Sequence, residues 1–215
     1  MKKTFAIVAL LVMVVSVVSA GSVYFDSGVS FSNGNRTYKI DDYNYEGKSV
    51  KYSMTSLPLE IGYREAFDNG VVVSGSAGVF FNLSEKFNGH TNDGDKYFPT
   101  HFSLKVLAGY GMKINEKLAA EFLGGLSYSF GSNSEEGTGF KYKVSQSTII
   151  LVGEAGVKYE IADSITLRAG AKIGIPFASS MKATVTMGSN SETEKAKLSG
   201  FMINFTPFVG AAYQF

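Results

Sequence analysis

Cysteine is absent from the 215-residue sequence, and this absence excludes several kinds of chemistry. The chain can form no disulfide framework, no thiolate metal site and no cysteine nucleophile. Its stability must therefore come from packing and hydrogen bonds.

An excess of charge of one sign is also absent. Twenty Lys and Arg residues stand against 19 Asp and Glu residues, which gives a net charge of +1. Because no bulk positive charge attracts a polyanion, nucleic-acid binding is not expected. Proline is scarce, with four residues, while 45% of the chain is apolar, a composition typical of ordered proteins rather than collagen-like or low-complexity ones.

Long apolar runs are missing beyond the first 20 residues. Lys2 and Lys3 precede an apolar stretch that ends at Val18-Ser19-Ala20. This is the layout of a secretory signal peptide, and the stretch is shorter than the roughly 20 residues that span a bilayer as a helix. We therefore expect residues 1–20 to be a signal peptide removed after Ala20, and residues 21–215 to form one domain.

A period of two dominates the remaining sequence and predicts an all-β chain. Alternate apolar positions indicate eight strands, near residues 23–31, 50–63, 71–83, 102–114, 118–130, 149–161, 165–177 and 201–215. The first two are the least regular. Long polar connections are expected at 32–50, 84–99, 131–146 and 178–198, and short ones at 64–70, 115–117 and 162–164. Strict alternation of long and short connections is typical of an antiparallel up-and-down membrane barrel with both termini in the periplasm.

A water-soluble sandwich or barrel would turn its apolar face inward, so the orientation of the faces must be decided. The apolar faces run for seven or eight alternate positions without a charge, which matches the roughly 9 to 11 residues of a tilted membrane strand. The opposite faces carry small residues together with charges that we expect to pair across a narrow lumen: Glu60, Lys105, Glu121, Glu154, Arg168 and Lys172. The sequence thus predicts a transmembrane barrel.

The last strand ends Phe205-Thr-Pro-Phe-Val-Gly-Ala-Ala-Tyr213-Gln-Phe215, and we expect Pro207 at a bulge or a site without a ladder hydrogen bond. With the leader and the eight strands, this ending resembles the small outer-membrane β-barrel proteins, such as the transmembrane domain of OmpA, OmpX and the opacity-type proteins. The resemblance implies an outer-membrane location in a diderm bacterium, with lipids including lipopolysaccharide as partners. It also implies that the barrel assembly machinery reads an apolar terminal signal, formed by Phe205, Val209, Tyr213 and Phe215.

An eight-stranded barrel encloses little more than its own side chains, so a general diffusion pore is not favoured. The lumen charges are interpreted as a structural plug, with a gated ion path as the alternative. A channel for small solutes or hydrophobic compounds thus stays open as a function.

One pair of residues suggests an enzyme. His101 and Ser103 are similar to the His-x-Ser pair of outer-membrane lipid A deacylases, with Glu116 or Glu121 downstream. Both fall on the inward face, whereas a lipid substrate would approach from outside. We therefore expect no enzyme activity, with a lipid A-modifying hydrolase as the last alternative. Asp93-Gly94-Asp95 lacks the ligand series of a calcium loop, and no metal or cofactor is expected.

The four long connections combine both signs of charge with aromatic residues, which supply rigid contact area at protein interfaces. We expect contacts from Tyr43, Tyr45, Phe87, Tyr97, Phe140 and Tyr142. Because loops on a rigid scaffold commonly carry binding, the leading hypothesis is a structural protein with a surface-interaction role, such as adhesion or the binding of a host factor.

Overall fold

A computed structural model describes residues 21–40, 45–47, 49–91, 100–188 and 190–215 of the chain. The expected signal peptide therefore lies outside the described residues. Among those described, none forms a helix long and apolar enough to cross a membrane.

The described residues form one antiparallel sheet. Its strands are β1 (Gly21–Gly28), β2 (Ser30–Ile40), β3 (Tyr45–Glu46), β4 (Val50–Ala66), β5 (Val71–Phe87), β6 (His90–Thr91), β7 (Thr100–Lys113), β8 (Leu118–Gly137), β9 (Phe140–Ala162), β10 (Ile165–Met187), β11 (Asn190–Ser199) and β12 (Met202–Gln214).

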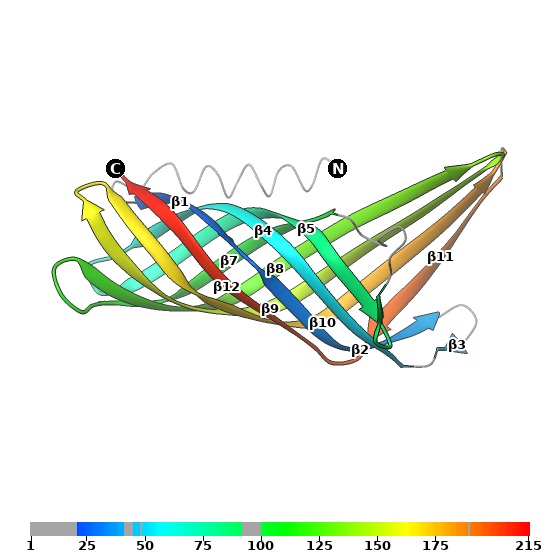
Figure 1. Ribbon diagram of the computed structural model, residues 1–215, viewed down its shortest axis with the longest axis horizontal. Helices are drawn as coiled ribbons and strands as arrows, with labels where there is room; N and C mark the ends of the chain where they lie inside the picture. The colour runs from blue at the N-terminus through cyan, green and yellow to red at the C-terminus, as the bar shows by residue number, and fades with distance from the viewer. Residues whose placement is uncertain (1–20, 41–44, 48, 92–99, 189) are drawn as a thin grey trace.

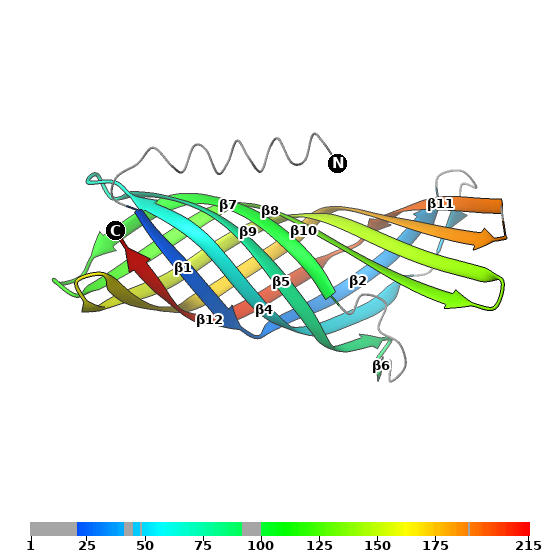
Figure 2. The same ribbon diagram turned by 90° about the horizontal axis from the view of Figure 1, so that it is seen from above.

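The sheet closes into a barrel because β1 pairs with β12, for example at Phe25 and Ala211. β1 and β2 follow one another along a single line of the wall, because both pair with β4 and with β12. β12 and β11 likewise share one line, because β10 pairs with β12 along one half and with β11 along the other. Within the described residues the wall thus has eight strand lines, as predicted. Short turns, the start of β1 and the end of β12 lie at one end of the barrel, the turn end, whereas the longest hairpins extend from the other, the hairpin end (Figures 1 and 2).

Pro207 faces the interruption between β1 and β2. Pairing with β12 stops at Gly28 and Phe208 and resumes at Phe31 and Phe205 in the same register, so no residue is inserted. The Val29 N–H donates to the Pro207 carbonyl oxygen at 3.4 Å. Of the two alternatives expected for Pro207, the structure therefore shows an interrupted ladder and not a bulge.

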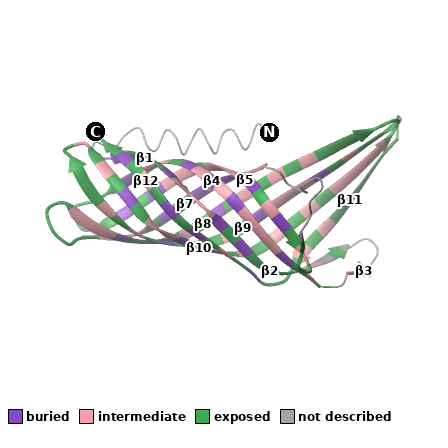
Figure 3. Ribbon diagram, viewed as in Figure 1, coloured by how far each residue is buried: buried purple, intermediate pink, exposed green. Residues whose placement is uncertain are grey.

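The barrel wall has an apolar outside and a polar inside. Leu126, Leu151 and Ile173 expose about half of their surface outward, whereas Glu60 and Arg168 are buried at the axis. Figure 3 shows exposed and buried residues alternating along the strands. An outer surface this apolar is stable when hydrocarbon covers it, so the predicted orientation of the faces is confirmed.

The lumen is not entirely polar. Val72, Leu107, Leu123 and Val152 form a buried apolar cluster inside the barrel. Sequence alternation alone assigned small or polar residues to this face. The cluster fills space beside the charged side chains and leaves less room for water.

Two of the four expected loops are β-hairpins instead, and residues 32–40 of the first expected loop belong to β2. Residues 131–146 and 178–198 continue the strands as the hairpins β8–β9 and β10–β11, with glycines of positive φ in their turns at Gly139 and Gly188. We call these extensions the surface sheet: residues 131–137, 140–148, 178–187 and 190–199. Their polar composition indicated loops, but alternating Thr and Val residues such as Thr184, Val185 and Thr186 favour strands.

A bulge marks the base of the surface sheet on β10. Pro176 pairs with Ile150, whereas Ala178 pairs with Ile149, so Phe177 is an extra residue on β10. A single inserted residue reverses the faces of everything beyond it. Odd positions of β10 therefore face outward up to Phe177, and inward from Ser179 onward.

Candidate functional site

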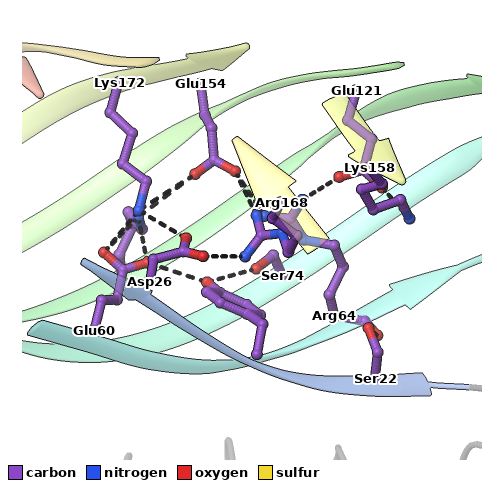
Figure 4. Close-up of polar contacts among 12 residues, drawn as sticks. Ser22, Asp26, Glu60, Arg64, Ser74, Glu121, Glu154, Lys158, Arg168 and Lys172 are labelled. Carbon is purple, nitrogen blue, oxygen red and sulfur yellow. Dashed lines mark hydrogen bonds and ion pairs between the residues drawn. The ribbon is translucent and has the colours of Figure 1, made fainter. Parts of the chain in front are cut away.

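The structure brings all six expected lumen charges together. Glu60 comes from β4, Lys105 from β7, Glu121 from β8, Glu154 from β9, and Arg168 and Lys172 from β10. Each exposes no more than 9% of its surface. Figure 4 shows Glu60, Glu121, Glu154, Arg168 and Lys172 converging from opposite walls of the barrel.

Glu60 lies between two ammonium groups. Lys105 Nζ is 2.7 Å from Glu60 Oε1, and Lys172 Nζ is 3.1 Å from Glu60 Oε2. Both carboxylate oxygens thus have a cationic partner, which offsets the cost of removing three charges from water.

Three further charged residues complete the network. Asp26 Oδ1 accepts a hydrogen bond from Arg168 Nη1 at 2.8 Å, Arg64 Nη2 lies 2.7 Å from Glu154 Oε1, and Lys158 Nζ lies 2.6 Å from Glu121 Oε1. Arg64 also pairs with Glu121. Asp26 and Lys158 share the parity of the inward residues on their strands, so alternation could have identified them. Arg64 was assigned to a turn that in fact begins after β4.

Tyr24 is the neutral centre of this network. Its ring lies 4.2 Å from the Arg168 guanidinium and 5.1 Å from that of Arg64, both within the range of cation–π attraction. Its hydroxyl donates to Glu60 Oε1 at 3.2 Å and contacts Ser74 Oγ at the same distance. One aromatic residue therefore links both arginines to the Glu60 side of the network.

Among the described residues the network contains four carboxylates and five cationic side chains. Removing either member of a buried pair would leave an uncompensated charge. We call this network the plug, because it lies in the narrow lumen of an eight-stranded barrel.

A cavity of about 140 Å³ lies above the plug, toward the hairpin end. Glu60, Lys105 and Lys172 form its floor, and hydroxyl and amide side chains form much of its wall. Near the mouth, Arg36 donates to Gln146 Oε1 at 3.3 Å and lies 4.4 Å above the Tyr52 ring.

The residues of the hydrolase hypothesis are not assembled into a catalytic unit. His101 stacks on Phe80, with ring centroids 4.7 Å apart, and both His101 and Ser103 line the cavity. Glu121 is bound to Arg64 and Lys158, and Glu116 lies in the turn after β7 at the other end of the barrel. No carboxylate of the proposed set therefore orients the histidine, as a triad requires.

The six aromatic residues expected to make loop contacts lie in different parts of the structure. Tyr43, Tyr97 and the Asp93-Gly94-Asp95 segment lie outside the described residues, and Tyr45 belongs to β3. Phe87 ends β5 and packs against Tyr52, with ring centroids 5.2 Å apart. Phe140 and Tyr142 belong to the surface sheet, where Phe140 is exposed and Tyr142 is half-buried.

All four residues of the expected terminal signal point outward. Phe205, Val209, Tyr213 and Phe215 are exposed on the apolar surface, and the rings of Tyr213 and Phe215 meet edge to face at 5.8 Å. They are therefore accessible from the outside of the wall near the closing seam of the barrel.

Solved structures that share this fold include two outer-membrane proteins and a bacterial surface protein. OprG from Pseudomonas aeruginosa is 17% identical, with a TM-score of 0.54 over 92% of this chain and 97% of that one. AlkL in lipid bilayers is 14% identical, with a TM-score of 0.52 over 92% and 90% of the two chains. Neisserial surface protein A is 13% identical, with a TM-score of 0.51 over 92% of this chain and all of that one.

No protein-family model matches the sequence, and no curated protein matches it. The likeness is therefore one of fold. The chain has the fold of the small outer-membrane β-barrel proteins, in agreement with the resemblance seen in its sequence.

Proposed function

We propose that this protein is a plugged outer-membrane barrel that acts at the cell surface as a recognition protein. The observation that carries the proposal is the surface sheet, which extends the wall beyond the barrel in two connected hairpins (Figure 1). A plugged lumen and an enlarged sheet outside the membrane favour binding over transport.

The inner face of the surface sheet is apolar and acidic. Val144, Ala183 and Glu194 stand opposite one another across β9, β10 and β11, so they share this face. Phe140 and Met187 at its tip expose 47% and 64% of their surface. Exposed aromatic and methionine side chains beside acidic groups supply contact area for a protein partner. The partner class is therefore a host or cell-surface protein.

The outer face of the same sheet is basic. Lys182 stands directly opposite Lys195, and Lys143 lies on the same face one ladder step away. Like charges directly opposed across a sheet are destabilising unless an anion lies between them. Lys182 follows the outward-facing Phe177 along β10, and Lys143 and Lys195 lie beside it on β9 and β11, so we place these lysines at the depth of lipid headgroups. The phosphate groups of lipopolysaccharide are the proposed counter-ions.

The proposed topology places the short turns and both termini in the periplasm. Long hairpins outside and short turns inside are the rule in bacterial outer-membrane barrels. In this orientation the surface sheet faces the medium, and the exposed Phe205, Val209, Tyr213 and Phe215 form the segment that the barrel assembly machinery would recognise.

The test is a trimmed barrel in which residues 134–143 and 184–193 are each replaced by a two-residue Asn-Gly turn. Cells that display the intact chain should bind to host-cell monolayers or immobilised serum proteins, and cells with the trimmed barrel should not. A difference in gel migration between unheated and heated samples would show that the trimmed barrel still folds. Equal binding by both folded barrels would overturn the surface role.

A gated path for small solutes is a second candidate, and the open cavity above the plug favours it. Single-channel recording in planar bilayers separates the two. The plug predicts no steady conductance for the intact chain and brief openings for Arg64→Ala, which removes two ion pairs. Steady conductance of the intact chain would favour the path.

A further inference from the structure

We infer that the cavity above the plug binds a small, neutral, polyhydroxylated solute of monosaccharide size from the outer medium. The inference does not depend on the surface sheet having a protein partner. It rests on the volume of the cavity, on the charge balance of its floor and on the polar groups that the fold leaves without partners.

The volume admits a solute of this size. The cavity measures about 140 Å³. Each enclosed water needs roughly 10–15 Å³ by this measure, so about ten waters fit, and a single sugar ring would displace most of them. The mouth residue Arg36 is held to Gln146 and Tyr52, which defines the opening.

The floor does not select an ion. Both oxygens of Glu60 are paired with Lys105 and Lys172, and Asp26 pairs with Lys172 and Arg168. A charged ligand would have to break pairs that are buried, at a large cost. Each carboxylate at the floor thus already has a cationic partner, and an uncharged ligand can bind without breaking any of these pairs.

Neutral polar groups remain available on the wall. Asn204 Oδ1 is buried and has no hydrogen-bond partner among the described residues. Across the described wall, no partner is found for the hydroxyls of Ser103 and Ser129 either, although both line the cavity. Several other hydroxyls of the wall are paired, as in Thr206 to Ser30 at 2.8 Å. An orphaned buried acceptor is costly, and a ligand hydroxyl would satisfy it once the Asn204 amide turns toward the cavity.

Apolar surface completes the site. The stacked rings of Phe80 and His101 contribute to the wall on the same side as Ser103, and Phe208 lies at the floor. Sugar rings have hydroxyl edges and apolar C–H faces, so they suit a wall that combines hydroxyls, an amide and aromatic rings. A purely apolar compound would leave the Asn204 amide oxygen unsatisfied.

The experiment is an amide-resolved NMR titration of the folded barrel in lipid nanodiscs, which carry no sugar headgroup. D-glucose, D-galactose, glycine and inorganic phosphate serve as probes. We expect a hexose to give saturable shifts at the cavity residues Ser103, Ser129 and Asn204. Tighter binding of glycine or phosphate would overturn the neutral ligand class, and the absence of saturable shifts with either hexose would overturn the site.

Asn204→Leu and Asn33→Leu form a matched pair. Asn204 faces the cavity and Asn33, on the adjacent strand β2, faces outward beside the exposed Ile203. Loss of a hydrogen bond and of space should weaken hexose binding about tenfold for Asn204→Leu and leave it unchanged for Asn33→Leu. Ser129→Val provides a second variant if Asn204→Leu does not fold. Equal affinities for the intact chain and the folded cavity variant would place the hexose elsewhere and contradict the inference.

Discussion

Arg168 donates from Nη1 to Asp26 Oδ1 at 2.8 Å, across 142 residues of sequence. Arg168 belongs to β10 and Asp26 to β1, the strands on either side of β12. The pair therefore spans the seam at which the first and last strands close the barrel. A buried pair in this position couples formation of the plug to closure of the wall.

Asp26→Ala should lower the free energy of unfolding by about 3 kcal/mol, because Arg168 and Lys172 each lose a buried counter-ion. Reversible urea unfolding in lipid vesicles measures the change. Glu136→Ala is the control, since Glu136 is in a solvent-exposed pair with Lys141 and its removal should change the unfolding midpoint far less. Equal effects of the two variants would show that the plug does not stabilise the barrel.

The bulge at Phe177 determines the register of the surface sheet. Val144 stands opposite Ala183, whereas without the bulge it would stand opposite Lys182. Cysteines introduced as Val144→Cys with Ala183→Cys should form a disulfide on mild oxidation, and Val144→Cys with Lys182→Cys should not. Because the chain has no cysteine of its own, a gel shift reports the bond directly. The reverse pattern would mean that the faces of the surface sheet are exchanged.

The tip of the β8–β9 hairpin should be sensitive to acid. Lys141 beside Glu136 donates to that carboxyl and lowers its pKa below the ordinary value. A lowered pKa in the folded hairpin means that the stabilisation is present above the ordinary pKa and is lost as the pH falls through the lowered one. NMR titration of the Glu136 carboxyl should show its pKa rise in Lys141→Gln. An unchanged titration would mean that the two side chains do not pair in solution.

The barrel could be predicted from the sequence because lipid imposes a strict rule on its outer face. Residues such as Leu151 and Ile173 must alternate with lumen residues such as Glu154 and Lys172, and that alternation is visible without an alignment. The same rule located six of the nine residues that form the plug. Arg64 was missed because the irregular second strand gave no clear end.

The surface sheet could not be predicted in the same way. Beyond the membrane no solvent enforces an apolar outer face, so Lys182 and Thr184 look like loop residues although they continue the ladder. The bulge at Phe177 also conceals the continuation of β10. Apolar residues stay at odd positions through Val185, but odd positions point outward before the bulge and inward after it. Pairing partners, which set the register, are not encoded in local periodicity.

The inverted orientation of the wall is the central claim, and neighbouring residues on β9 test it. Leu151 exposes 53% of its surface to the outside, whereas Val152 exposes 7% and packs in the lumen. The chain has no tryptophan, so Leu151→Trp and Val152→Trp each carry a single reporter. In vesicles of lipids brominated on their acyl chains, the fluorescence of Leu151→Trp should be quenched strongly and that of Val152→Trp should not. Strong quenching of Val152→Trp with no quenching of Leu151→Trp would contradict the account.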